Sequence, residues 1–224
     1  MDGILNLDKP PGLSSARAVD RVKRLLPRGT KVGHAGTLDP FATGVLLVLV
    51  GRATKACEAL MGQPKQYVTT IKLGATTATL DPESPEVVTP AAVPVTREQV
   101  DAALPRFVGT IQQVPPAFSA MKVGGRRAYD LARRGHDVQL APRPVVVYGI
   151  EVLDYVWPLL TIRMDCGRGT YVRSIARDLG DALGAGGYLT ALRRTATGSF
   201  TDASATPPDR LSSAEDVARV LSST

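Results

Sequence analysis

A run of six apolar residues, Val45 to Val50, most constrains how this chain can fold. Gly44 precedes the run and Gly51 ends it, so the pattern predicts a short buried strand. The run is far too short to cross a bilayer. The first ten residues start acidic and contain no long apolar stretch, which is not typical of a signal peptide. The sequence therefore predicts a cytoplasmic protein.

Helices and strands are predicted in mixed order around this strand. Ser14 and Ser15 can cap a helix that runs to about Leu26. Capping and periodicity predict further helices at about 53–61, 96–104, 129–134, 170–183 (capped by Thr170) and 214–221. Short apolar or alternating runs predict strands at about 67–73, 145–156, 160–165 and 189–200. Because strands and helices do not alternate regularly, we expect an α+β fold with a mainly antiparallel, mixed β-sheet flanked by helices and loops.

The segment from Asp81 to Val95 differs in composition from its surroundings. It contains four prolines and three acidic residues and lacks basic ones. Repeated proline blocks both helical and ladder hydrogen bonds, so we expect a surface insertion near 76–105. The remaining pattern predicts one domain over residues 1–210 and a short C-terminal helix or tail over 211–224.

The charge balance points to an anionic partner. The chain has 27 Lys and Arg against 21 Asp and Glu, a net charge of +6 and a pI near 9.5. Of the basic residues 20 are Arg, whose planar fork matches phosphate oxygens and stacks on bases. The composition is typical of a nucleic-acid-binding protein, although a GC-rich genome that favours Arg codons would also produce it.

Metal and nucleotide chemistry find no support in the motifs. Cys57 and Cys166 have no metal-ligand spacing and provide no disulfide framework, and neither His34 nor His136 lies in a metal-ligand pattern. No glycine-rich loop carries the Lys-Ser/Thr pair of a phosphate-cradling loop. We therefore expect neither a metal nor a cofactor.

The segment from Gly33 to Gly44 is the candidate catalytic loop. Its glycines allow tight turns and close approach of a large ligand. Asp39 is followed by Pro40, which biases Asp39 towards an extended backbone, so the loop presents one carboxylate at a rigid tip. Spacing alone also fits an aspartate that caps a turn into the strand.

Six ordered motifs, covering roughly residues 3 to 200, resemble the TruB-type tRNA pseudouridine synthase family. The loop Gly-His-Ala-Gly-Thr-Leu-Asp-Pro-Phe-Ala-Thr-Gly-Val-Leu resembles that family's catalytic loop. The other matching motifs are residues 3–12, 65–67, 115–122 with 129–133, 167–174 and 192–195. The resemblance implies the pseudouridine synthase fold, with residues 1–210 as the catalytic domain. It also implies isomerisation of uridine-55 in the T-arm of tRNA after the base is flipped out.

The resemblance assigns three catalytic residues. Asp39 would be the nucleophile, attacking C1′ or C6 or supporting a glycal route. Tyr67 would stack on the uracil, with its hydroxyl a candidate for proton transfer at C5, and Arg173 would be the cation that keeps Asp39 ionised. Taken alone, Tyr67 fits a half-buried strand tyrosine, and Arg173 fits a phosphate contact or a solvated helix charge.

Five further residues are expected to bind the substrate. His34 would contact the opened RNA loop and Leu192 would line the apolar base pocket, although alone they fit a hydrogen-bonded loop histidine and a core leucine. Tyr171 belongs to the motif that carries Arg173, and Lys9 and Arg193 are candidate phosphate contacts. The expected partner is the tRNA T-arm stem-loop, without a membrane or an obligate protein partner, for a monomeric enzyme.

Two departures from the family pattern stand out. Residues 77–84 keep the aspartate of the family motif, Asp81. Position 78 is alanine where the family usually has an acid or glycine, and position 84 is serine where it usually has glycine. The C-terminal RNA-binding domain usual in bacterial members is expected to be absent. Two alternative functions share these motifs: a tRNA-binding folding chaperone, and the catalytic subunit of a guide-RNA pseudouridylation complex.

Overall fold

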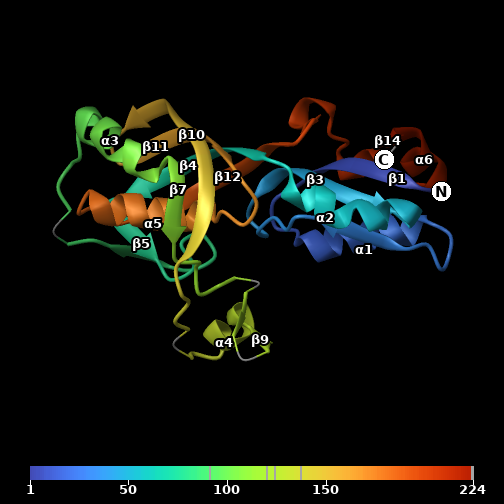
Figure 1. Ribbon diagram of the computed structural model, residues 1–224, viewed down its shortest axis with the longest axis horizontal. Coiled ribbons are helices and arrows are strands. Elements are labelled where there is room, and N and C mark those ends of the chain that lie inside the picture. The colour runs from blue at the N-terminus through green and yellow to red at the C-terminus, as the bar shows by residue number, and fades with distance from the viewer. Residues whose placement is uncertain (91, 120, 124, 137, 223–224) are drawn as a thin grey trace. The chain divides into compact units, whose positions relative to one another are not determined.

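The chain divides into two compact units (Figure 1). The computed structural model describes residues 1–90, 92–119, 121–123, 125–136 and 138–222, so Ala120 of the motif at 115–122 and the last two residues of the C-terminal tail lie outside it. The first unit comprises Met1–Val68 and Leu192–Thr224, and the second comprises Thr69–Ala191. Strands β4 (Lys65–Leu73) and β12 (Gly187–Thr197) contribute residues to both.

The sheet of the first unit is mainly antiparallel, as predicted. Its strands follow the order β14-β1-β3-β12-β4, with β2 paired to β3 and β13 paired to β12. Strands β1 and β3 pair antiparallel over their whole length, from Gly3 opposite Val50 to Lys9 opposite Gly44, whereas β12 runs parallel to β3. The strands not yet bounded are β1 (Gly3–Lys9), β2 (Val32–Ala35), β3 (Thr43–Val50), β13 (Phe200–Thr201) and β14 (Leu221–Ser222).

Both faces of β3 are covered, which explains its unbroken apolar sequence. On one face Val45, Leu47 and Leu49 form a buried cluster, against which Leu60 and Met61 pack. On the other face Leu46 and Val48 are completely buried. Because side chains alternate along a strand, a strand buried on both faces needs apolar residues at every position. The predicted buried strand at 45–50 is confirmed.

Helical segments pack on the first unit's sheet, among them α1 and the pair η1–α2. Helix α1 (Ser15–Leu25) begins at the predicted cap, where the Ser14 hydroxyl accepts a hydrogen bond from the Arg17 amide. The single helix predicted at 53–61 is instead a 3-10 turn, η1 (Gly51–Ala56), followed by α2 (Cys57–Gly62), because the Cys57 amide bonds to the Thr54 carbonyl, three residues back. The remaining helical segments of this unit are η3 (Asp202–Ser204), η4 (Pro208–Arg210) and α6 (Ala214–Val220).

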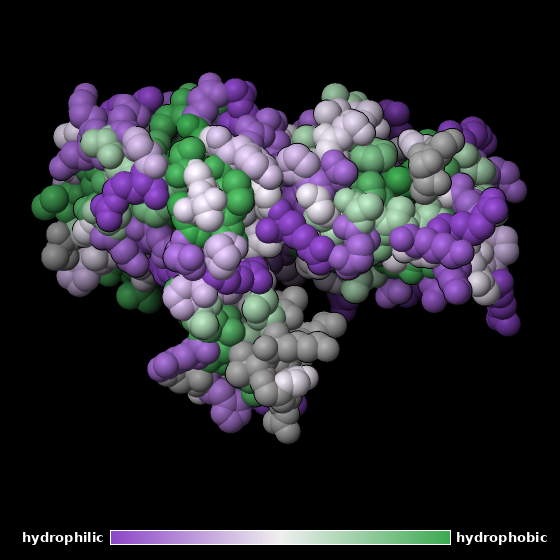
Figure 2. All heavy atoms as spheres, viewed as in Figure 1, coloured by the Kyte–Doolittle hydropathy of each residue, from purple (hydrophilic) through white to green (hydrophobic). Residues whose placement is uncertain are grey.

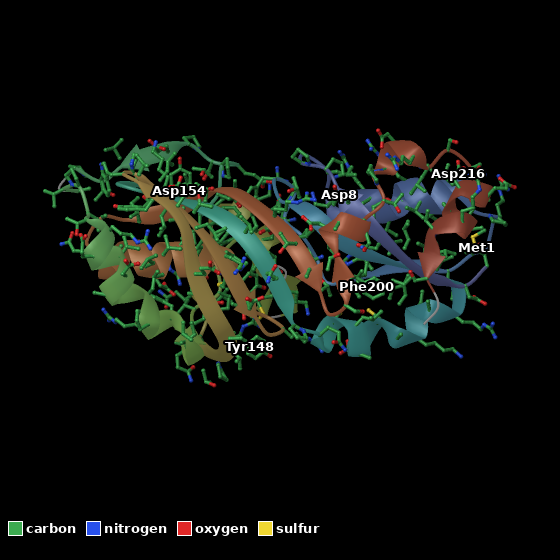
Figure 3. All side chains as sticks on the ribbon, turned by 90° about the horizontal axis from the view of Figure 1, so that it is seen from above. Met1, Asp8, Tyr148, Asp154, Phe200 and Asp216 are labelled. Carbon is green, nitrogen blue, oxygen red and sulfur yellow. The ribbon has the colours of Figure 1, made fainter. Side chains whose placement is uncertain are left out.

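The second unit is built on the antiparallel pair β10 (Arg143–Val156) and β11 (Leu159–Cys166). Its sheet follows the order β12-β4-β11-β10-β7, with β7 (Gly109–Gln113) antiparallel to β10. Figure 2 shows apolar side chains over β7 and β10. The exposed residues here include Val108, Val146 and Tyr148. Figure 3 labels Tyr148 and Asp154 along β10. Short hairpins are formed by β5 (Ala75–Thr77) with β6 (Glu86–Val88) and by β8 (Lys122–Val123) with β9 (Arg126–Arg127).

The helices of the second unit lie close to their predicted positions. Thr96 and Gln99 form the predicted capping box of α3 (Arg97–Ala103), which continues into η2 (Leu104–Phe107). The others are α4 (Ala128–Arg133) and α5 (Val172–Ala182). The prediction that Thr170 caps α5 is wrong. Its hydroxyl donates to the Gly167 carbonyl in the preceding turn, and the cap position belongs to Tyr171.

The middle of the proline-rich segment is exposed, whereas its ends at Asp81 and Val95 are buried. Val87 and Val88 in β6 are more than half exposed. Glu86, which directly precedes them, pairs with Lys72 of β4 and accepts a hydrogen bond from the Tyr188 hydroxyl. Burial and the Glu86 carboxylate together raise the pKa of Tyr188 to about 12, so this hydroxyl remains a donor at neutral pH.

Candidate active site

Asp39 lies half-buried in a loop between β2 and β3 of the first unit. Gly36 opens this loop with a φ of 95°, a conformation that favours glycine. The Asp39 carbonyl accepts a hydrogen bond from the Ala42 amide (3.1 Å), which closes a turn after the aspartate. Leu38 is buried beside it, so the loop is anchored next to its carboxylate.

Every carbonyl from residue 36 to residue 40 accepts a hydrogen bond. The donors to the four carbonyls other than that of Asp39 are the Arg194 guanidinium (Gly36 and Thr37), the Ser15 hydroxyl (Leu38), and the Gly12 amide and Lys9 ammonium (Pro40). The Ser15 hydroxyl also accepts from the Leu38 amide (2.8 Å). A loop whose polar backbone groups are satisfied by buried side chains has few alternative conformations.

Lys9, predicted to contact a phosphate, is engaged by protein groups. It is fully buried, because it follows Leu5 and Leu7 on the same face of β1. Its ammonium donates to the carbonyls of Pro10, Leu13 and Pro40. A group enclosed in this way braces the Asp39 loop, and its predicted phosphate contact remains a prediction.

Arg193 is likewise engaged by protein groups. Its guanidinium pairs with Asp8 (3.0 Å) and with Asp202 (2.8 Å), and its side chain is about one-third exposed. The two carboxylates raise the pKa of Arg193 through hydrogen bonds, while partial burial opposes them. A phosphate would have to compete with both carboxylates for this guanidinium.

His34 lies in β2, opposite Val48 of β3. Its Nδ1 is buried and has no hydrogen-bond partner within the described part of the chain. Burial lowers the pKa of His34, and the positive charge of Arg194 lowers it further, so the imidazole is neutral at pH 7. Its predicted RNA contact remains a prediction.

Tyr67 and Leu192 are the apolar candidates of the first unit. Tyr67 lies on β4, where alternate side chains from Lys65 to Leu73 are buried, and its own side chain is mostly buried. Leu192 is buried on β12. The predicted roles in holding the uracil require such apolar surroundings.

Arg173 lies in the first turn of α5, in the second unit, and is 5% exposed. One of its terminal nitrogens lies 3.3 Å from the carboxylate of Asp81, itself buried, and donates to the Thr79 carbonyl. The other donates to the Phe118 carbonyl. Asp81 also accepts hydrogen bonds from the Thr79 hydroxyl and the Glu83 amide, so this ion pair has the supporting bonds that a buried pair requires.

Tyr171 is held from two sides. The buried Gln113 side chain accepts from its amide and donates to its carbonyl. The Arg143 guanidinium lies over its ring, 5.2 Å from the centroid, and donates to the Gly169 carbonyl. Neither Gln113 nor Arg143 was predicted from the sequence, because neither lies in a recognised motif.

The predicted catalytic residues are thus distributed over both units. Asp39 and Tyr67 belong to the first and Arg173 to the second. Among the described residues, no three potential metal-ligating side chains cluster. In the same part of the chain, none of the helices has the length and apolar character needed to cross a membrane.

Comparison with known families accounts for nearly the whole chain. Residues 23–172 match the description "TruB family pseudouridylate synthase (N terminal domain)". Residues 173–220 match "tRNA pseudouridylate synthase B C-terminal domain".

Curated relatives and solved structures agree with that match. The protein named tRNA pseudouridine synthase B of Mycobacterium tuberculosis is 49% identical over 203 residues, which cover 88% of this chain and 67% of the relative. The protein of the same name from Bacteroides fragilis is 48% identical over 200 residues, which cover 87% of this chain and 86% of the relative. The structure described as "Crystal Structure of a Cbf5-Nop10-Gar1 Complex" superposes with a TM-score of 0.72 at 32% identity. That superposition covers 93% of this chain, which spans about half the length of the matched structure.

The expected fold and enzyme class are therefore both confirmed, and the chain belongs to the TruB family of pseudouridylate synthases.

Proposed function

We propose that this chain converts uridine-55 in the T-arm of tRNA to pseudouridine, with Asp39 as the nucleophile. The observation that carries the proposal is the Asp39 loop, which holds a half-buried carboxylate on a backbone whose five carbonyls from Gly36 to Pro40 are all hydrogen-bonded. Such fixed geometry is what a nucleophile needs to meet a flipped base without reorganisation. The names of the relatives support tRNA as the substrate.

The reaction is an isomerisation and needs no outside reactant. The N1–C1′ bond breaks, the uracil rotates, C5 bonds to C1′, the proton on C5 is lost, and N1 takes up a proton. An ionised carboxylate can attack C1′ or C6, or stabilise the charge while a glycal forms. Each route requires Asp39 to be deprotonated when the base arrives.

Arg173 and Tyr67 complete the proposed catalytic set. Arg173 would act as the cation that favours the ionised form of Asp39. Tyr67 would stack on the uracil, with its hydroxyl available for the proton transfer at C5. Leu192, His34 and Tyr171 would contact the base and the opened RNA loop. For Lys9 and Arg193 the hydrogen bonds and ion pairs support a structural role in place of the phosphate contacts.

Exposed cations of the first unit support RNA binding. Lys23 and Lys31 line a shallow cavity beside the backbone of residues 29–33. Both lysines are exposed and the chain carries a net charge of +6. Cations arranged in this way would release counterions from RNA phosphates, and the free energy gained would offset the cost of extruding the base.

Tritium release from a tRNA transcript labelled at C5 of uridine tests the proposal. The wild-type protein should release about one equivalent of tritium, and a transcript with cytidine at position 55 should release none. Asp39→Asn, which is nearly isosteric, should bind tRNA normally but retain less than a few per cent of the rate. Higher residual turnover would remove Asp39 from the nucleophile role.

A bare T-arm hairpin separates the alternative functions. We propose a cytoplasmic monomer that acts without an obligate protein partner, so the purified chain should modify the hairpin alone. Activity only with a guide RNA and partner proteins would instead identify a guide-RNA subunit. Refolding of tRNA without any tritium release would identify a chaperone.

A further inference from the structure

Arg194 is the largest fully buried side chain of the first unit, and the proposed function gives it no role. It is 1% exposed and lies on β12, in the motif Leu192 to Thr195. Removing a guanidinium from water is unfavourable unless each donor finds a partner. The hydrogen-bond partners of the Arg194 guanidinium therefore indicate what this buried side chain stabilises.

The three donor directions of Arg194 reach three backbone carbonyls. Nε donates to Val45 (2.7 Å), at the start of the buried run of β3. One terminal nitrogen donates to Gly36 (3.1 Å) and the other contacts Thr37 (3.4 Å). The side chain therefore connects β3 with the two residues that open the Asp39 loop.

The backbone of Arg194 is fixed as firmly as its side chain. In the parallel pair of β12 and β3, Arg194 lies opposite Gly44. A Cβ atom at position 44 would lie 2.2 Å from the Arg194 carbonyl oxygen, so only glycine allows this approach. The backbone of Arg194 is thus held against β3, which limits where its side chain can extend.

The neighbouring Arg193 shows that this is not a general feature of the strand. Adjacent residues of a strand point to opposite faces, and Arg193 pairs with the carboxylates of Asp8 and Asp202. Arg194 donates to uncharged carbonyls, which orient the group without neutralising it. Two arginines that are adjacent in sequence therefore have different partners.

We propose that Arg194 is a positioning residue for catalysis, which holds the Asp39 carboxylate in its reactive orientation by fixing the carbonyls of Gly36 and Thr37. The inference rests on the proposed function, because it presumes that Asp39 is the nucleophile. A lysine could keep the charge but not the planar fork that reaches three separate carbonyls. Charge alone is therefore not sufficient.

Arg194→Lys tests this inference under single-turnover conditions, with tRNA dissociation constants measured in parallel. We expect the rate of pseudouridine formation to fall about 10- to 100-fold, because small displacements of a reacting group have effects of that size. The dissociation constant should change less than about threefold, since the substituted group is buried. The matched control is Arg219→Lys, on exposed α6 of the same unit, which should leave both quantities unchanged.

Three outcomes would overturn the inference: an unchanged rate in folded Arg194→Lys, a parallel loss of binding, or rapid exchange of the Leu38 amide in the wild-type protein. The last measurement does not depend on a variant, so it applies even if Arg194→Lys fails to fold. We expect Leu38, whose amide bonds to Ser15, to be protected like the amides of β1. Asp39→Asn in the same assay separates the two proposals, because an active Asn variant contradicts the nucleophile and not the rigidity of the loop.

Discussion

The two units differ in the charge of the buried groups that support their proposed catalytic residues. In the first, the loop that carries the Asp39 carboxylate is fixed by the buried cations Lys9 and Arg194, which donate to its carbonyls. In the second, the Arg173 cation is fixed by the buried carboxylate of Asp81 and by two carbonyls. Buried groups of opposite sign thus contact the Arg173 guanidinium itself in the second unit and the backbone of the Asp39 loop in the first.

The difference between direct and indirect support predicts different consequences of mutation. A buried ion pair that loses one member leaves an uncompensated charge, so its disruption lowers global stability. A backbone brace that is lost frees a local loop, so its disruption affects catalysis more than folding. Substitutions that remove one support at a time can distinguish these two cases.

Asp81→Asn should have the largest effect on stability. It removes the charge opposite buried Arg173 and keeps the shape, so the free energy of unfolding should fall by about 3–5 kcal/mol in urea denaturation. Asp101→Asn is the control, because Asp101 pairs with Arg97 on exposed α3 and its loss should cost at most about 1 kcal/mol. If the two substitutions lowered the free energy of unfolding equally, the buried ion pair would contribute no more to stability than the exposed one.

Ser15→Ala should have a smaller effect on stability and a larger one on turnover. It leaves the buried amide and carbonyl of Leu38 without the Ser15 hydroxyl, at a cost of about 1–3 kcal/mol. Ser14→Ala removes only the cap of the same helix, at a cost of about 1 kcal/mol. We expect tritium release to slow about tenfold for Ser15→Ala and to be unchanged for Ser14→Ala. If both variants slow turnover alike, helix α1 and not the loop is responsible.

His34 should produce the smallest effect, visible only below neutral pH. Its pKa in the folded protein is lowered, so below about pH 6.5 the unfolded chain takes up the proton first. Stability should fall as pH drops from about 6.5 through the lowered pKa, and the loss should then level off. The free energy of unfolding, measured by urea titration at each pH, should depend less on pH in His34→Gln. The control His136→Gln, which alters the chain's other, exposed histidine, should keep the wild-type pH dependence. A slope that survives His34→Gln belongs to another group.

Much of the fold followed from local patterns. The caps at Ser14 and Thr96 and the buried run at 45–50 are governed by interactions within a few residues, so sequence predicted them well. Strands β1 and β7 were not predicted, because each is defined by its pairing with a strand distant in sequence. The boundaries of the two units were equally hidden, since they fall inside β4 and β12, not in linkers.

The sequence suggested residues for the candidate site but not the contacts that these residues make. The motifs proposed Asp39 and Arg173 as catalytic residues, yet no pattern within residues 77–84 indicated that Asp81 pairs with Arg173. Sequence also placed Arg193 on the RNA and left Arg194 unassigned. Only the register of β12 against β3 decides which of two adjacent arginines points inward.

The alternation of side chains along β1 explains the burial of Lys9. Leu5 and Leu7 are buried, so Lys9 shares their face, and a strand assignment alone would have predicted its burial. A charged residue in phase with an apolar face is expected to satisfy backbone carbonyls and not a distant ligand.

The close approach of β12 to Gly44 limits how this sequence can diverge. Position 44 tolerates no side chain while the Arg194 carbonyl stays where it is, and its φ of 97° is itself unfavourable for other residues. Variation there cannot be gradual, because even a methyl group requires the two strands to separate. Libraries that diversify this loop for altered substrate selectivity should therefore keep position 44 fixed and vary residues outside the 36–40 brace.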